Sequence, residues 1–173
     1  MFAPTGRDQL DLIVMRTSIR PSPRARDLVD LRRPERQLVV QGVGGTSATL
    51  STADLAKLQQ QTVKTIDHGT PVTFQGVLLA DVLSKVALPT GEAFHSTASS
   101  YYLLVEAKDG YRVVFAWAEL DSSLMDKAVY VVTMRDGKPL SDKEGPFRLV
   151  APGEKRAARW ARQVTALRIR QAN

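Results

Sequence analysis

The chain of 173 residues contains no cysteine and only two histidines, His68 and His95. The lack of cysteine excludes disulfide bonds, thiolate metal sites, iron–sulfur clusters and cysteine nucleophiles. A zinc site would need carboxylates to complete its ligand set, and no spacing such as H-E-x-x-H is present. The sequence therefore predicts no metal site, and we assign His95 no role.

Long apolar runs are also missing. No window approaches the roughly 18 consecutive apolar residues that a membrane-spanning helix needs. The first fifteen residues lack the basic-then-apolar order of a signal peptide. Hydrophobic residues make up 43% of the chain and charged residues 24%, which is ordinary for a globular protein in water. We expect a soluble protein without a membrane span, and these features leave its compartment open.

Acidic residues are scarce in residues 145–170, which contain seven arginines and lysines but only one acidic residue, Glu154. This excess equals the formal net charge of the whole protein, +6. A turn at Pro152 and Gly153 leads into the basic cluster. Guanidinium groups bind phosphate in bidentate fashion and a turn can add backbone N–H donors, so the stretch is a candidate anion site. The alternative is a solvated surface.

The isoelectric point near 9.8 suggests nucleic-acid binding, but the distribution of charge argues against it. Residues 37–147 carry nine basic and twelve acidic groups, so the basic excess lies at the two ends of the chain. The basic stretch has one aromatic residue, Trp160, that could stack on a base. We expect no nucleic-acid partner.

Residues 1–36 are predicted to be an extended or partly disordered lead-in, because residues 20–24 read Arg-Pro-Ser-Pro-Arg, a polyproline-like sequence. A short apolar patch at residues 10–14 makes this segment a candidate contact for a protein partner or for a second copy of the chain. Residues 37–173 are predicted to form a single domain.

Within that domain, alternating apolar residues and turn signals predict mainly β-strands. The expected strands cover residues 38–40, 46–50, 62–66, 71–74, 101–107, 112–115 and 128–134, with a last strand around 167–170. Two short helices are expected. One begins after a capping box at residues 51–54, and the other spans 78–86, where Leu79, Val82, Leu83 and Val86 share a face. Residues 88–99 are predicted to be a polar loop and 116–125 a short helix or irregular segment. The fold class is α+β, mostly β.

Four motifs occur in a characteristic order. They are L-V-V-x-G with S-T-A-D-L, then F-Q-G-V-L-L-A-D-V-L, then D-G-Y-R-V-V-F, and finally D-G-K-P-L followed by G-P-F-R-L-V-A-P-G and R-W. Together they resemble the molybdopterin-binding domain of sulfite oxidase-type oxidoreductases, in a small stand-alone form, over residues 38–169. The resemblance implies the mixed, mostly β fold of that family with short helices, and molybdopterin as the cofactor. It also implies a periplasmic location, although the chain shows no signal peptide.

The resemblance also implies roles for individual residues. Basic side chains of the family hold the pterin phosphate, which would place Arg156 and Arg159 on that phosphate, with Arg148 on the neighbouring strand as a further cofactor-binding residue. Trp160 would stack on the pterin or on an arginine, or close the core beneath the basic loop. Arg112 alternates with apolar residues on a strand and is a candidate pocket residue, or simply solvated. We expect Tyr111, beside it, to be a core or rim aromatic rather than an acid–base group.

One departure from the family pattern concerns the metal. Active members bind molybdenum through a cysteine thiolate, in a stretch that corresponds here to residues 65–70 and contains no cysteine. Soft thiolate ligation is therefore unavailable, which makes molybdenum binding doubtful. Asp67 and His68 lie at about the same place. Three interpretations are open: a replacement pair of metal ligands, a polar contact to a bound molecule through His68, or a turn in which Asp67 and Gly69 serve the backbone geometry.

Three functional hypotheses follow. The first is a module that binds a pterin or another small anion without the usual molybdenum redox catalysis. The second is a molybdopterin-dependent oxidoreductase with non-cysteine metal ligation. The third is a structural or interaction protein with a vestigial pocket. The sequence favours the first, because the basic cluster is retained while the thiolate is not.

Overall fold

The computed structural model describes residues 36–88, 100–120 and 126–172. By internal contacts the chain divides into Met1–Arg33 and Pro34–Asn173, and all described residues belong to the second unit. The predicted lead-in lies outside the described residues except for Arg36. Most of the predicted loop at 88–99, including His95, and the second half of the segment 116–125 also lie outside them. Among the described residues, no helix is long and apolar enough to cross a membrane.

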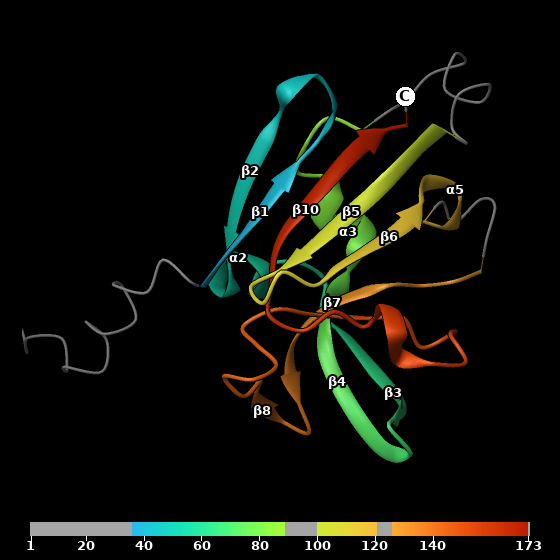
Figure 1. Cartoon of the computed structure of the whole chain (residues 1–173). Coiled ribbons are helices and arrows are strands. Elements are labelled where there is room, and N and C mark those ends of the chain that lie inside the picture. The colour runs from blue at the N-terminus through green and yellow to red at the C-terminus, as the bar shows by residue number, and fades with distance from the viewer. Residues whose placement is uncertain (1–35, 89–99, 121–125, 173) are drawn as a thin grey trace, which may run out of the picture. The chain divides into compact units, whose positions relative to one another are not determined.

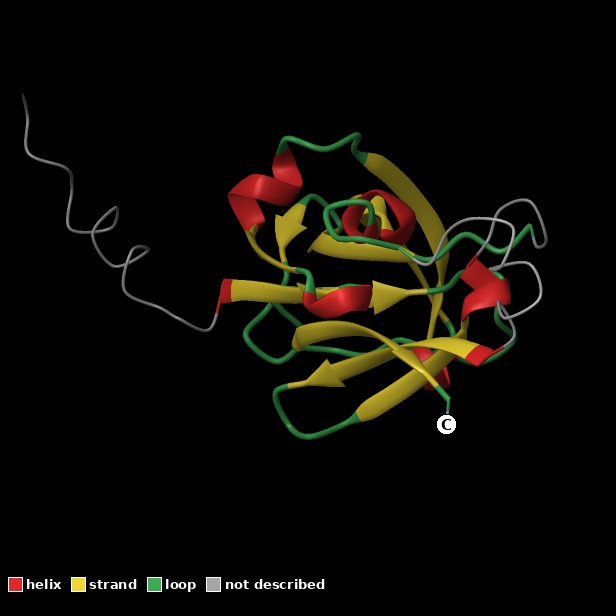
Figure 2. Ribbon diagram, turned by 90° about the horizontal axis from the view of Figure 1, so that it is seen from above, coloured by secondary structure: helices red, strands yellow, loops and turns green. Residues whose placement is uncertain are grey.

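Two sheets form the domain (Figures 1 and 2). The first sheet has the order β2 (Ser47–Ser51), β1 (Gln37–Gln41), β10 (Val164–Gln171), β5 (Tyr101–Ala107) and β6 (Arg112–Ala116). Its strands pair antiparallel except β1 and β10, which are parallel, with Val39 opposite Ala166. The first and last described strands are therefore neighbours at the centre of this sheet.

The second sheet has the order β3 (Gln61–Asp67), β4 (Thr70–Leu78), β7 (Tyr130–Arg135) and β8 (Lys138–Pro139). A further strand, β9 (Arg148–Val150), pairs antiparallel with β7. The turn between β3 and β4 has only two residues, His68 and Gly69, both at positive φ (50° and 83°). A two-residue turn with positive φ at both positions matches the twist of the flanking strands, so at this end β3 and β4 each extend one residue further than the sequence predicted.

Short helical elements connect the strands. They are α2 (Thr52–Ala56), α3 (Leu79–Leu83), α5 (Trp117–Leu120) and the 3-10 turns η2 (Val43–Gly45) and η4 (Ala157–Arg159). The predicted capping box is present in α2: Ser51 Oγ accepts from the Asp54 amide, and the Asp54 carboxylate accepts from the Ser51 amide at 3.0 Å. All four residues predicted to share the apolar face of the second helix are buried, although the helix itself ends at Leu83.

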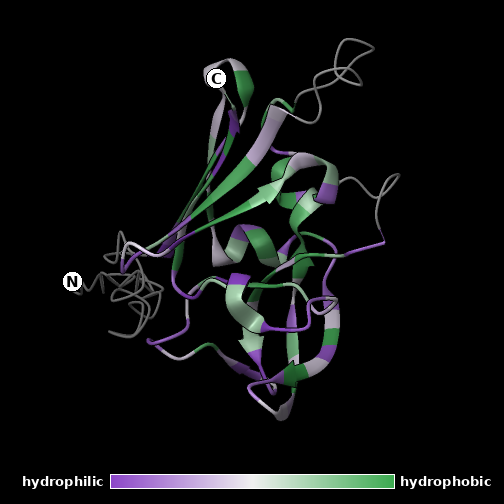
Figure 3. Cartoon of the chain, turned by 45° about the vertical axis from the view of Figure 1, so that its right-hand side comes forward, coloured by the Kyte–Doolittle hydropathy of each residue, from purple (hydrophilic) through white to green (hydrophobic). Residues whose placement is uncertain are grey.

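The core consists of the inward-facing residues of both sheets together with α3. On β5 and β10 the buried positions include Leu103, Val105, Leu167 and Ile169, and they alternate with partly exposed polar residues such as Glu106 and Arg168. Figure 3 shows the hydrophobic stretches along the strands and central helices, with hydrophilic residues mainly in the turns. The α+β, mostly β fold class predicted from the sequence is therefore confirmed.

Candidate functional site

The basic stretch forms a loop between β9 and β10 that lies beside the β3–β4 turn, and two adjoining hollows open between them. The larger has a volume of 760 Å³ and the smaller of 240 Å³. Four residues line both: His68, Ala157, Ala158 and Trp160. The larger volume falls in the range of roughly 300–1,000 Å³ that is typical of small-molecule sites. The sequence-predicted anion loop therefore borders a cavity of suitable size.

Main-chain and tryptophan hydrogen bonds hold the base of this loop. The Leu149 amide donates to the Ala161 carbonyl at 2.8 Å, and the Val164 amide donates to the Phe147 carbonyl at 2.9 Å. Trp160 is 5% exposed, its indole N–H donates to the Ala151 carbonyl at 3.0 Å, and its ring meets Phe74 edge-on. Trp160 therefore closes the core beneath the basic loop, one of the alternatives predicted for it, and its edge borders both hollows.

Arg148 is almost fully buried, with 1% of its surface exposed, and it lines the smaller hollow. Its two terminal nitrogens donate to the two oxygens of Asp67 at 3.0 and 3.1 Å. The guanidinium lies over the rings of Phe74 and Trp160, 5.1 and 5.8 Å from their centroids. A bidentate ion pair between two aromatic rings holds the side chain in one orientation.

Two further charges complete this cluster. Glu144 accepts from Arg148 at 2.6 Å and from Arg135 at 2.9 Å, and Arg135 also donates to Asp67 at 3.2 Å. The cluster thus contains two cations and two anions. The Nε of Arg148 has no hydrogen-bond partner although it is buried. An unsatisfied buried donor in a cluster this well paired calls for an explanation.

Opposing effects act on the Asp67 carboxyl. Burial by itself raises its pKa, but the hydrogen bonds and charge of Arg148, with the charges of Arg135 and His68, outweigh burial and lower the pKa below its usual value. Asp67 is therefore ionised at neutral pH with both oxygens occupied by arginine donors. Asp67 is therefore more than a turn residue, because its side chain forms ion pairs with Arg148 and Arg135 instead of hydrogen bonds to the backbone.

Arg159, predicted on the phosphate, is held elsewhere in the structure. Its guanidinium donates to Glu154 and, at 2.7 Å, to Glu119, and it lies 4.3 Å from the centroid of the Phe115 ring. Burial lowers the pKa of Arg159, but the two carboxylates outweigh this and raise it. Arg159 lines neither of the two hollows. The residue ties the basic loop to α5.

The exposed cations at the hollows are Lys155, Arg156 and Arg162. Among the described residues, none of the three takes part in an ion pair. Arg162 lies 3.4 Å from the Nε2 of His68, across the smaller hollow. Because arginine only donates, the histidine nitrogen is the acceptor in this contact. The sequence-based site omitted Arg162, although it belongs to the same basic stretch.

The remaining predicted residues lie at the rim or away from the hollows. His68 is exposed and lines both. Tyr111 is 47% exposed and its hydroxyl donates to the Ala158 carbonyl at 2.6 Å, so it is a rim aromatic. Arg112 lines neither hollow and pairs with Glu106 at 3.3 Å on the first sheet. The structure thus brings together Arg148, Arg156, Trp160 and His68 but not Arg112 or Arg159.

The donor set fits an anion better than a metal. The chain has no cysteine, and no group of three or more histidine, aspartate or glutamate side chains that could hold a metal occurs in the part of the chain that the structure describes. Asp67, which the sequence resemblance puts near the position of the family's thiolate, has both oxygens on Arg148. The cationic rim suits an anionic group, whereas the residues that the structure describes offer no set of metal ligands.

Comparisons with known proteins agree with the geometry. The family model described as the oxidoreductase molybdopterin-binding domain matches residues 25–173. Among solved structures, the sulfane dehydrogenase SoxCD from Paracoccus pantotrophus is similar at a TM-score of 0.62 and 16% identity. The match covers 79% of this chain but 39% of the SoxCD chain. The search of curated proteins returned no match.

The family match begins inside the segment predicted as a lead-in and runs through the basic loop to the end of the chain. The likeness to SoxCD, at this low identity, concerns the fold. The chain therefore belongs to the oxidoreductase molybdopterin-binding domain family, as its four sequence motifs predicted.

Proposed function

We propose that this protein is a binding module for a small anionic ligand of the molybdopterin class and performs no molybdenum redox catalysis of the usual kind. The observation that carries the proposal is the Nε of Arg148, a buried donor without an acceptor on a residue that lines the smaller hollow. Because this nitrogen is buried, a phosphate or pterin oxygen in that hollow reaches it only with a small shift of the lining side chains. A buried donor that lacks its hydrogen bond costs about 1–3 kcal/mol.

The balance of charge supports an anion. Arg148 and Arg135 are neutralised by Asp67 and Glu144, so the buried cluster offers no excess negative charge to the hollows. Lys155, Arg156 and Arg162 at the rim are left without carboxylate partners among the described residues. A ligand with two negative charges would balance part of the positive charge of these three side chains and could accept from the Nε of Arg148. We assign Arg156 and Arg162 to the outer oxygens and Arg148 to the inner one.

The state of Asp67 favours binding without metal. The two oxygens of Asp67 accept three hydrogen bonds from Arg148 and Arg135, so a metal would compete with these donors. Loss of the pair would leave the buried Arg148 with Glu144 alone, at a cost of several kcal/mol. For the oxidoreductase hypothesis, Asp67 would have to give up that pair. The interaction-protein hypothesis, in contrast, leaves the Nε of Arg148 unexplained.

The test is to express the full chain in a host that makes the cofactor, and to analyse the purified protein for molybdenum and, by mass spectrometry, for released small molecules. We expect a pterin at near-stoichiometric amount and molybdenum far below it. The variant Arg156→Glu, Arg162→Glu should lose the pterin, and the charge-matched variant Lys85→Glu, Lys138→Glu, on exposed residues outside both hollows, should retain it.

Two results would overturn the proposal. Molybdenum equal to the pterin would establish the metal-dependent hypothesis and make Asp67 the next residue to replace. A protein with neither pterin nor metal, from a host whose other molybdopterin proteins are loaded, would leave the interaction-protein hypothesis standing.

A further inference from the structure

β3 is the outermost strand of the second sheet, and one of its edges has no strand partner among the described residues. The contacts of β4 show which backbone groups lie on that edge. Thr73 faces β7, because its amide donates to Asp136 Oδ1 at 2.9 Å and its carbonyl accepts from the Asp136 amide at 2.7 Å. Residues of an antiparallel strand face one neighbour and the other in alternation. Lys64, opposite Thr73, therefore turns its N–H and C=O away from β4.

The same orientation applies to Ile66, two residues further along β3. It lies opposite Pro71, which has no N–H to donate, and the pair that closes the two-residue turn is Asp67 with Thr70. The amide and the carbonyl of Ile66 thus point to the open edge, and neither forms a hydrogen bond within the described part of the chain. The Ile66 side chain is 64% exposed and lies outside the core, so this residue contributes little to packing.

The larger hollow of the candidate site lies along this edge. Thr65 and Ile66 both line it, although successive side chains of a strand point to opposite faces of the sheet. A hollow that both residues reach is located beside the strand edge and not over one face. Pro152, Lys155 and Arg156 of the basic loop line the same hollow. The open backbone groups of Ile66 therefore border the cavity that the basic loop also borders.

The length of open edge in this hollow limits what it accepts. Thr62 and Lys64, whose backbone groups face the same way, do not line the hollow. An extended peptide that adds a strand to a sheet uses a row of such groups. Here the hollow offers the one N–H donor and the one C=O acceptor of Ile66. This pair matches the edge of a planar heterocycle in which a ring N–H lies next to a ring carbonyl, as in a lactam or a pyrimidinone.

We infer that the backbone of Ile66 recognises the heterocycle of the bound ligand, with its N–H donating to a ring carbonyl and its C=O accepting from the adjacent ring N–H. The inference rests on the proposed function, because Arg156 and Arg162 hold the phosphate of the same ligand. It narrows the ligand class to a phosphate carried by a lactam-type heterocycle, of which the pterin ring is one example. A phosphate on a simple hydrocarbon body lacks the second half of this recognition.

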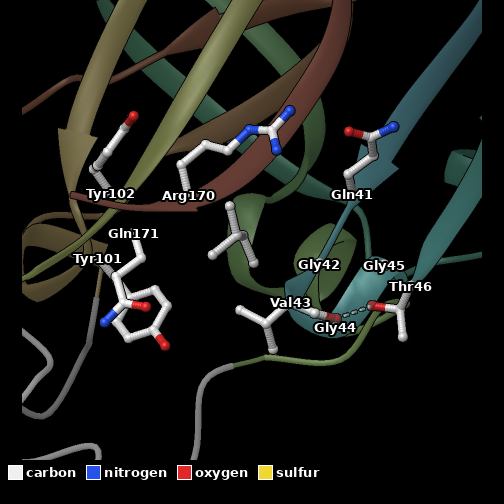
Figure 4. Close-up of a pocket in the computed structure, with 11 residues that line it drawn as sticks. Gln41, Gly42, Val43, Gly44, Gly45, Thr46, Tyr101, Tyr102, Arg170 and Gln171 are labelled. Atoms are coloured by element: carbon white, nitrogen blue, oxygen red, sulfur yellow. Dashed lines mark hydrogen bonds between the residues drawn. The ribbon is translucent and has the colours of Figure 1, made fainter. Parts of the chain in front are cut away.

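A further hollow, of 670 Å³, lies at the end of β10 remote from the basic loop (Figure 4). Figure 4 shows the turn of residues 42–45 on one side of it and Tyr101 with Gln171 on another. None of its lining residues borders the candidate site. A ligand anchored on Arg156 and Arg162 does not occupy this hollow, so its amides serve as the reference in a titration.

The backbone contact is tested by NMR titration of the isotope-labelled full chain with lumazine, whose ring carries an N–H between two carbonyls. The comparison compound is N,N-dimethyllumazine, in which methyl groups replace both N–H hydrogens. We expect a saturable shift of the Ile66 amide resonance with lumazine. The dimethyl compound should bind at least about fivefold more weakly, because it leaves the Ile66 carbonyl without a donor. The Gly44 amide, in the hollow at the end of β10, should shift with neither compound.

Proline replacements remove the donor while the strand pairing is kept. Ile66→Pro deletes the N–H that faces the hollow and breaks no hydrogen bond between β3 and β4, and Lys64→Pro does the same outside the hollow. Both variants should unfold at similar urea concentrations. Lumazine should bind Ile66→Pro at least about fivefold more weakly than Lys64→Pro. Ile66→Ala, which keeps the N–H, should bind within about twofold of the unmodified chain.

The inference is wrong if lumazine leaves the Ile66 amide unshifted, if the dimethyl compound binds equally well, or if the two proline variants bind lumazine alike. It is also wrong if Ile66→Ala binds as weakly as Ile66→Pro, because the side chain then makes the contact. If Ile66→Pro does not fold, the two lumazines on the unmodified chain decide. Failure of the proposed function is a separate result, in which the unmodified chain copurifies with no pterin whatever lumazine does at Ile66.

Discussion

Asp67 and Arg148 are 81 positions apart in the sequence, yet both oxygens of Asp67 accept N–H groups of the Arg148 guanidinium. Asp67 ends β3 and Arg148 begins β9, and β4 and β7 lie between these strands in the sheet. The arginine spans that width by lying over Phe74 of β4, with Arg135 of β7 joining the same carboxylate. One charged cluster therefore links four strands beside the candidate site.

We expect replacement of Asp67 to destabilise the protein strongly. Asp67→Ala removes the bidentate partner of a buried arginine, and the loss should approach 3 kcal/mol of unfolding free energy, the lower end of the values of about 3–5 kcal/mol for such pairs. Urea denaturation measures it. Asp81→Ala, a carboxylate in the first turn of α3, should cost less than about 1 kcal/mol. Equal losses for both would mean that Arg148 re-pairs with Glu144 alone.

Stability should also fall in acid through Asp67. Because its pKa is lowered on folding, its contribution is present in full above the unfolded pKa, about 3.9, and is lost as the pH falls through the lower folded value. The unfolding free energy should thus decline below about pH 4. In Asp67→Asn this decline should be shallower, since that variant has no carboxyl to protonate at this position. Denaturation at a series of pH values between 2 and 7 gives the unfolding free energy of the unmodified chain and of Asp67→Asn. Parallel curves for the two proteins would show that Asp67 does not cause the loss of stability in acid.

The capping box of α2 makes a second, local prediction. The hydrogen bonds from the Ser51 side chain, together with those from its amide and from Lys57, lower the pKa of Asp54 to about 2. The carboxyl carbon resonance of Asp54, followed by NMR against pH, should therefore have a midpoint near 2. In Ser51→Ala the largest of these contributions is absent, so the midpoint should rise. A midpoint near the ordinary value in the unmodified chain would mean that the capping box does not persist in solution.

Gly76 and Gly153 should respond differently to alanine. A Cβ at Gly76 would lie 2.2 Å from the Val131 carbonyl oxygen and 2.5 Å from the Val132 Cα, both backbone atoms of β7. The strands must separate, so we expect Gly76→Ala to cost at least about 2 kcal/mol. At Gly153 the nearest atom would be 3.7 Å away, on the flexible Lys127 side chain, and Gly153→Ala should stay within about 1 kcal/mol of the original. Thermal unfolding of the two variants compares them directly.

Replacement of Arg159 should affect stability, whereas replacement of Arg162 should affect ligand binding. Arg159→Gln breaks contacts with Glu119 and Glu154 and should lower stability by about 1 kcal/mol, with the bound pterin retained. Arg162→Gln should leave stability nearly unchanged and reduce the amount of pterin that copurifies. Denaturation midpoints and released pterin are measured on the same preparations. Loss of pterin in Arg159→Gln at unchanged stability would restore the phosphate role that the sequence pattern predicts for that residue.

Local patterns were sufficient to predict much of the fold. The capping box, the apolar face of α3 and the alternation along β5 and β10 each depend on residues close in sequence, and each is present. The four ordered motifs identified the family, which the match over residues 25–173 confirms. The β3–β4 hairpin was underestimated by one residue per strand at its turn because His68 adopts positive φ, which is uncommon for a residue other than glycine. At the other end β4 was underestimated because residues 75–78 pair with β7, a strand distant in sequence.

The contacts of individual arginines were beyond sequence reasoning, because seven similar side chains in one stretch have different partners in three dimensions. Arg148 is buried on Asp67, Arg159 is held by two glutamates, and Arg162 faces His68. Those partners come from β3, from α5 and from the loop itself. Net charge identified the stretch, whereas only the tertiary structure distinguishes its structural cations from the exposed ones. The site residues themselves stay predictions until ligand binding is measured.

The parallel pairing of β1 with β10 has a consequence for how the protein is made. During synthesis, the β1–β2 pair and the β5–β6 hairpin emerge from the ribosome well before β10, the strand that joins them. Until then the two pairs have unfilled edges and exposed apolar faces, which are the features that invite aggregation and chaperone binding. Because β10 also follows directly after the basic loop, neither the candidate ligand site nor the centre of the first sheet can be completed before β10 has been synthesised.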